Sequence, residues 1–240
     1  FMALVALLAV VAVRDQPPGV DAKSQRERRE SLRYVLAGSW AVMRTPSILT
    51  ITSGGIALSA GNAILGIWGG PYLNDVHGLG QTERGAVLIF MACSGILGHF
   101  LYGQASRVIG SLKSLVLGGT AAISVIMGTL ALLPAPNVIT VTVLLAALGM
   151  ACGFPTIMLA HSRALVPDYL IGRALTTVNT GVMIAIAAMQ MAIGGIIGSV
   201  MISSDGQATA EGYRTAFGFF AVMAVLTFVI YSRAKDAKPR

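Results

Sequence analysis

The sequence predicts an all-α membrane protein with six complete transmembrane helices and the end of a seventh. Charged residues make up only 11% of the 240 residues, against about 25% in an average soluble domain. Six apolar runs have about the length of 20 residues that a membrane-spanning helix needs, and basic residues gather in alternate connections between them. Water cannot satisfy backbone groups inside a bilayer, so each run is expected to be helical.

The first 13 residues are apolar but too short to span a membrane, since they would form a helix of about 20 Å. No basic stretch precedes them and no small-residue cleavage site follows, as a secretory signal peptide would require. The chain also does not begin with Met. We therefore expect residues 1–13 to be the end of a truncated transmembrane helix that runs inward.

Residues 14–47 are expected to form a basic cytoplasmic linker that contains a short amphipathic helix. Apolar side chains recur there at helical spacing, at Leu32, Val35, Leu36, Trp40 and Met43. Pro46 would end this helix. An interfacial helix of this kind suits anionic lipid headgroups. The alternative is that the same residues are the first turns of the next span.

The six predicted spans lie within residues 48–232 and form one transmembrane bundle. They occupy residues 48–73, 85–105, 114–133, 138–160, 175–200 and 215–232, and none of these runs contains an acidic or basic residue. Pro155, with Gly153 beside it, predicts a bend in the fourth run. Gly-x-x-x-Gly pairs at 66/70, 149/153 and 194/198 predict close packing of helices.

The distribution of basic residues predicts the orientation. Fifteen of the 17 Lys and Arg residues lie in segments 14–47, 106–113, 161–174 and the tail 233–240. The other three connections hold only Arg84 and Arg214. The positive-inside rule places the side that is rich in Lys and Arg, including the C-terminus, in the cytoplasm. The net charge of +7 is thus a topological signal, and no nucleic-acid partner is expected.

Uncharged polar side chains at membrane depth are the candidate solute contacts. In the fifth run, Asn179 and Gln190 lie on one helical face, eleven residues apart. Asn62 lies near the middle of the first run. Each amide could instead bond a neighbouring helix. Trp68, near the outer end of the first run, is either an interfacial anchor or an aromatic wall of the cavity.

His99 is the candidate proton-coupling group, because histidine ordinarily changes charge near physiological pH. The alternative is a neutral ring bonded to a backbone carbonyl. The two cysteines, Cys93 and Cys152, lie in apolar runs and form no metal-ligand spacing, and the three histidines are scattered. We therefore expect no metal site and no cofactor.

Local sequence resembles bacterial members of the major facilitator superfamily at three places. The first is Trp-Gly-Gly-Pro-Tyr-Leu-Asn-Asp at residues 68–75, and the second is Gly-Arg-Ala at residues 172–174, leading into Asn179. The third is the loop 103–113, which is similar to the family's signature cytoplasmic loop, Gly-x-x-x-Asp-Arg-x-Gly-Arg-Lys. Gly103 and Gly110 match this pattern, and Lys113 supplies charge beyond them. Arg107 stands at the acidic position and Val108 at the following arginine position, so the locking role of that acid is not carried over.

The resemblance implies the C-terminal half of a twelve-helix protein, built from inverted three-helix repeats. It implies a secondary active transporter that moves a small solute across the bacterial inner membrane by alternating access, coupled to protons or another ion. The partner would be a missing N-terminal six-helix half. The alternatives are a six-helix passive channel and an oligomeric membrane scaffold. An enzyme is not expected, because no span contains an acid or a nucleophile–base pair.

Overall fold

The computed structural model describes Trp40, Val42 and residues 44–134, 136–203 and 210–238. Residues 38–240 form a compact unit of their own, and the fold below is the fold of that unit. The predicted truncated helix at residues 1–13 lies outside the described residues, as does most of the predicted linker with its amphipathic helix.

Six helical segments among the described residues are long and apolar enough to span a membrane. They are Ser47–Asp75, Gln81–Ile109, Leu112–Leu132, Val138–Ala164, Asp168–Ser199 and Ala210–Tyr231. The predicted all-α fold with six spans is therefore confirmed. The helices extend past the apolar runs, because charged residues also stabilise helix ends. Helix α7 (Gln81–Ile109), for example, has Glu83 in its first turn and Arg107 in its last.

The first span is built from four helical pieces rather than one regular helix. These are α4 (Pro46–Thr52), α5 (Gly54–Ala63), the π-helical turn η1 (Ile64–Trp68) and α6 (Gly69–Asp75). A π turn widens the helix locally and often occurs at functional sites.

The predicted bend in the fourth span is confirmed, between α9 (Val138–Ala151) and α10 (Pro155–Ala164). Proline at the start of α10 lacks the N–H that would continue the helix. At the bend, a Cβ on Gly153 would lie 2.6 Å from the backbone nitrogen of His99 in α7. Close packing is thus confirmed for Gly149 and Gly153, whose backbones contact α7.

The prediction of close packing is wrong, within the described residues, for three of the four glycines in the other two Gly-x-x-x-Gly pairs. No described atom lies within 4 Å of a Cβ built on Gly66, Gly70 or Gly198. Glycine spacing alone does not say whether a neighbouring helix is present on that side.

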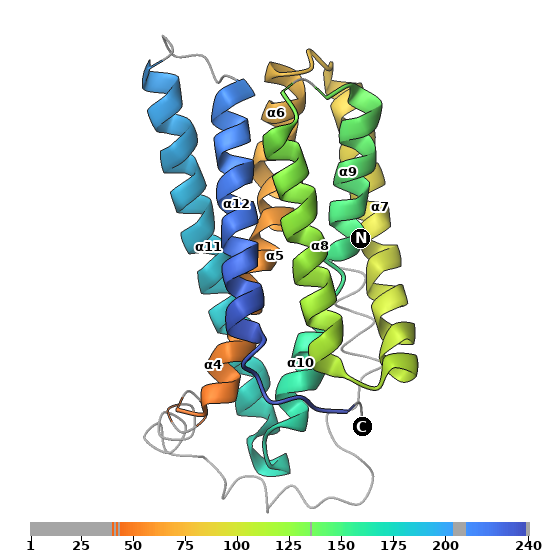
Figure 1. The fold of residues 1–240 in the computed structure, drawn as a ribbon, viewed down its shortest axis with the longest axis vertical. Helices are drawn as coiled ribbons and strands as arrows, with labels where there is room; N and C mark the ends of the chain where they lie inside the picture. Colours follow the sequence, from red (N-terminus) through yellow and green to blue (C-terminus); the bar gives the residue numbers. More distant parts are fainter. Residues whose placement is uncertain (1–39, 41, 43, 135, 204–209, 239–240) are drawn as a thin grey trace, which may run out of the picture. The chain divides into compact units, whose positions relative to one another are not determined.

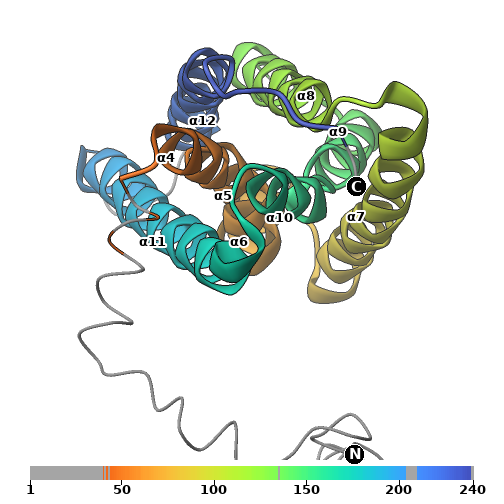
Figure 2. The same cartoon turned by 90° about the horizontal axis from the view of Figure 1, so that it is seen from below.

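The spans pair with the symmetry of two inverted repeats. The second span (α7) packs on the fourth (α9), as the fifth, α11 (Ile171–Ser203), packs on the first (α5). The third span, α8 (Leu112–Leu132), and the sixth, α12 (Ala210–Tyr231), pair with each other. Figure 2 shows α8 and α12 together on one side, α5 and α10 centrally, and α7 and α11 at the edges.

Burial follows this arrangement. In the most apolar window of the first span 61% of the residues are buried, against 17% in the second and the fifth. The bundle therefore forms around α5, and α7 and α11 each present a broad exposed face. Two ends can be distinguished (Figure 1): the end where α4 begins and α12 ends, called here the basic end, and the opposite end.

Candidate functional site

The first span and α11 run side by side in the same direction, and close contacts fix their register. A Cβ on Gly181 would overlap the Thr52 side chain, and a Cβ on Gly55 would lie 2.8 Å from Val182 Cα. Farther along, a Cβ on Gly194 would lie 3.8 Å from Trp68 Cζ2. Residues between these contacts therefore lie at matching depths on the two helices.

Asn62 and Gln190 lie at similar depth because both fall between the contacts at Gly55 and Trp68. Asn62 is exposed, and its Nδ2 donates a hydrogen bond of 3.0 Å to the Leu58 carbonyl oxygen in its own helix. Gln190 is half-buried, one helical turn before Gly194. The structure thus brings Asn62 and Gln190 to similar depth, with Trp68 about two turns beyond Asn62 along the first span.

Trp68 closes the π turn, and its ring packs toward Gly194 of α11. Its Nε1 is shielded from solvent and has no hydrogen-bond partner among the described residues. A buried N–H without an acceptor costs about 1–3 kcal/mol. Trp68 Nε1 is therefore an unsatisfied donor among the described residues.

Asn179 lies apart from this group. It comes before Gly181 and is therefore nearer the basic end than the Thr52 contact. Eleven residues separate it from Gln190, which is about 16 Å along a helix axis. Asn179 is exposed, as is Met183 on the same face. One small solute cannot touch Asn179 and Gln190 together.

His99 is exposed on α7. Its Nδ1 lies 2.8 Å from the Gly95 carbonyl oxygen, and since a carbonyl only accepts, Nδ1 donates this bond.

The loop that resembles the family signature forms a tight turn between α7 and α8. Gly110 has φ +66°, a left-handed conformation that glycine adopts without strain. Gly103 has open space around it, and Arg107 is exposed. Lys113 is half-buried in the first turn of α8. The left-handed backbone therefore explains why glycine stands at position 110. No contact among the described residues requires glycine at position 103.

The C-terminal strap, residues 232–238, is attached to this turn, which the sequence did not predict. Asp236 accepts hydrogen bonds from Ser111 Oγ at 2.7 Å and from the Lys113 backbone N–H at 3.2 Å. The Leu112 N–H donates to the Ala237 carbonyl oxygen at 3.0 Å. The strap thus supplies hydrogen-bond acceptors for the free N–H groups at the N-terminus of α8. It also places a negative charge there, which the helix dipole favours.

The Asp236 carboxylate is held in its charged form by these contacts. Burial opposes ionisation, but hydrogen bonds from Ser111 Oγ and from the backbone N–H groups of Lys113 and Ala237 outweigh it, so the pKa of Asp236 is lowered. A carboxylate therefore does reach the signature turn. It comes from the far end of the chain and not from position 107.

His161 attaches the strap to α10. Its ring is fully buried, with Nε2 donating to the Lys235 carbonyl oxygen at 2.8 Å and Nδ1 lying 2.8 Å from the Tyr231 hydroxyl. In the neutral ring Nδ1 accepts the Tyr231 O–H. The only sequence signal for the His161–Tyr231 contact is a polar residue on the buried face of α10. Periodicity alone does not say which residue it contacts.

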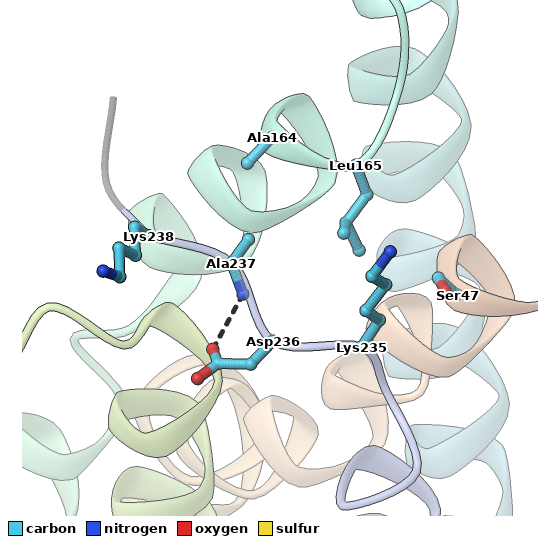
Figure 3. A pocket seen from close by; sticks show the side chains of 7 residues that line it. All are labelled: Ser47, Ala164, Leu165, Lys235, Asp236, Ala237 and Lys238. Carbon is cyan, nitrogen blue, oxygen red and sulfur yellow. Dashed lines mark hydrogen bonds between the residues drawn. The ribbon is translucent and has the colours of Figure 1, made fainter.

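A pocket of about 470 Å³, called here the basic pocket, opens beside the strap at the basic end. Its lining comes from the start of α4, the end of α10 and the strap (Figure 3) and consists of Ser47, Ala164, Leu165, Lys235, Asp236, Ala237 and Lys238. At the opposite end, Tyr213 of α12 donates a 2.8 Å hydrogen bond to Asp75 and joins the sixth span to the first. No cluster of three or more metal-ligating side chains occurs within the described residues.

These features define a multi-pass helical membrane protein with two uncharged polar side chains, Asn62 and Gln190, at similar depth near mid-span. The family model of the Major Facilitator Superfamily matches residues 1–190. The chain therefore belongs to the major facilitator superfamily.

A solved structure with a similar fold is the xylose transporter XylE from E. coli in an inward-open conformation, with a TM-score of 0.62 and 17% sequence identity. The match covers 79% of this chain and 47% of that one, so the matched region corresponds to about half of XylE. At this identity the likeness shows the fold alone. No curated protein sequence matches the chain.

Proposed function

We propose that this chain is half of a secondary active transporter that moves a small solute by alternating access. One observation supports this most strongly: in a chain of this family, Asn62 and Gln190 lie at similar depth near mid-span, with Trp68 farther toward the opposite end, on helices with an exposed face. Polar side chains at membrane depth typically mark a solute path. The partner would be an N-terminal six-helix half, with the solute between the halves.

The solute is proposed to be small and neutral. The three side chains offer two amides and one indole N–H, which can donate and accept hydrogen bonds but carry no charge. XylE, whose fold is similar, is a xylose transporter, so a neutral hydroxylated solute is a reasonable first probe. Asn179, which lies nearer the basic end, would contact the solute only as it enters or leaves the mid-span site.

The basic end is proposed to face the cytoplasm of a bacterial inner membrane. The positive-inside distribution of Lys and Arg supports this orientation. His99 remains the candidate for proton coupling, because its residue is exposed and the described hydrogen bond engages only Nδ1.

The test is solute exchange in proteoliposomes that contain the intact protein. Vesicles loaded with unlabelled xylose are diluted into labelled xylose, with other neutral solutes as further probes. A transporter accumulates label transiently by counterflow, and Gln190→Ala and Asn62→Ala should reduce this. Thr129→Ala is the matched control, because Thr129 is a half-buried residue of α8 whose hydroxyl donates to the Val125 carbonyl oxygen of its own helix.

Uptake without counterflow would instead support the passive channel. If no neutral solute moves while charged solutes do, the proposed solute class is wrong. Equal activity of Gln190→Ala and Thr129→Ala would remove the mid-span face from the mechanism.

A further inference from the structure

The basic pocket at the foot of the bundle has no role in the proposed solute path. It lies beside the C-terminal strap, whereas Asn62 and Gln190 lie far along the spans, beyond the Gly55–Val182 contact. Figure 3 shows Lys235 rising from the strap toward Leu165 and Ser47, with Lys238 farther along the same stretch. Both ammonium groups belong to exposed residues, so an aqueous or headgroup ligand can reach them.

The acid of the pocket lining, Asp236, is engaged on the side of α8. Both oxygens of Asp236 accept hydrogen bonds on the side of α8, from Ser111 Oγ and from the Lys113 N–H. Within the lining itself, the Ala237 N–H also donates to Asp236, at 2.8 Å. The carboxylate is therefore hydrogen-bonded at the α8 turn. Lys235 and Ser47 lie together at one side of the lining, and the Lys238 side chain points away from them (Figure 3).

The backbone that carries the lysines is fixed on both sides. His161 Nε2 holds the Lys235 carbonyl at 2.8 Å, and the Leu112 N–H holds the Ala237 carbonyl at 3.0 Å. A site whose main chain is already ordered loses less conformational entropy when a ligand binds. The lysines are thus presented on a rigid segment, not on a free tail.

We propose that the basic pocket binds a phosphate group, with Lys235 and Lys238 supplying charge and Ser47 a hydroxyl donor. Lysine binds phosphate as a point charge, and the pocket lining, with two lysines and the Asp236 carboxylate, keeps a net positive charge. The pocket volume of about 470 Å³ leaves room for the group that bears the phosphate. The phosphate comes either from an anionic lipid headgroup or from a free anion at the basic end.

The test measures the reaction rate of individual lysines with an amine-reactive reagent, by mass spectrometry of the intact protein in nanodiscs. In phosphatidylcholine discs, inorganic phosphate is titrated against chloride at constant ionic strength. In a second arm without phosphate, part of the lipid is replaced by phosphatidylglycerol. Lys113 is the internal control, since it lies outside the pocket lining.

Phosphate or phosphatidylglycerol should slow the labelling of Lys235 and Lys238 but not of Lys113. Protection by inorganic phosphate identifies a free anion, and protection only by phosphatidylglycerol identifies a lipid headgroup. In Lys235→Ala, the affinity for the protecting phosphate group is measured from the labelling of Lys238. It should fall about tenfold, the loss expected for one charge-assisted hydrogen bond. Arg233→Ala, which removes an equal charge from an exposed strap residue outside the pocket, should change little.

Two results would overturn the proposal. One is no selective protection in either arm. The other is an equal loss of affinity in Lys235→Ala and Arg233→Ala, which would mean that the effect is the general charge of the basic end. Neither result depends on transport, so the proposed function is tested separately.

Discussion

The contact between α7 and the bent fourth span can be tested with one added methyl group. A Cβ on Gly98 would overlap the Met150 carbonyl oxygen and would lie 2.9 Å from Met150 Cα. The obstacle is backbone, so no side-chain rotation can relieve it. Overpacking costs about 1–3 kcal/mol, and replacing glycine by alanine inside a helix regains about 1 kcal/mol. We expect a net loss of up to about 2 kcal/mol for Gly98→Ala.

A loss of about 2 kcal/mol lowers Tm by about 4–8 °C in a chain of 150–250 residues. The assay is the apparent Tm of the purified protein in detergent, from the folded fraction that survives heating at a fixed rate. Gly149→Ala, whose Cβ would overlap the Met91 carbonyl, should behave in the same way. Gly118→Ala is the matched control, since no atom lies within 4 Å of its Cβ. Equal Tm values for Gly98→Ala and Gly118→Ala would refute the close contact.

Three further predictions concern polar groups. His161→Phe should release the strap, because it removes both hydrogen bonds at 2.8 Å. Trypsin should then cut after Lys235 faster than in the wild type. An unchanged cleavage rate would contradict the attachment of the strap by His161. The folded-state pKa of Asp236 is lowered, so its contribution is complete above its usual pKa of about 4 and is lost as the pH falls through the folded value. Strap attachment should therefore not vary between pH 5 and 8, and Asp236→Ala should speed hydrogen exchange of the Lys113 amide throughout that range. His99→Gln should flatten the pH dependence of uptake, and an unchanged profile would remove His99 from the coupling mechanism.

The spans could be predicted from the sequence because lipid imposes simple demands. Runs of uncharged residues must satisfy their own backbone, so length and composition suffice to count six helices. The bend at Pro155 was predictable for a similar reason, since proline removes a helical hydrogen bond whatever surrounds it.

Features that depend on a distant partner could not be predicted. The π turn at Ile64–Trp68 has no local sequence signal. The Asp236–Ser111 bond joins residues 125 positions apart. Gly66 and Gly149 have the same spacing signal, yet only Gly149 has a helix against it. The depth match of Asn62 with Gln190, and the separation of Asn179, likewise required the packing register of two helices.

The central claim is that the mid-span face at Asn62 borders a path open to water alternately from each side of the membrane. The measurement is the labelling of Asn62→Cys, with Cys93 and Cys152 replaced by Ala, by an impermeant maleimide in right-side-out and in inverted vesicles. Val125→Cys on α8, a 67% exposed mid-span position, serves as the lipid-facing control. Alternating access predicts labelling of Asn62→Cys in both vesicle types and of Val125→Cys in neither. An Asn62→Cys thiol that reacts from one side only, or from neither, would contradict it.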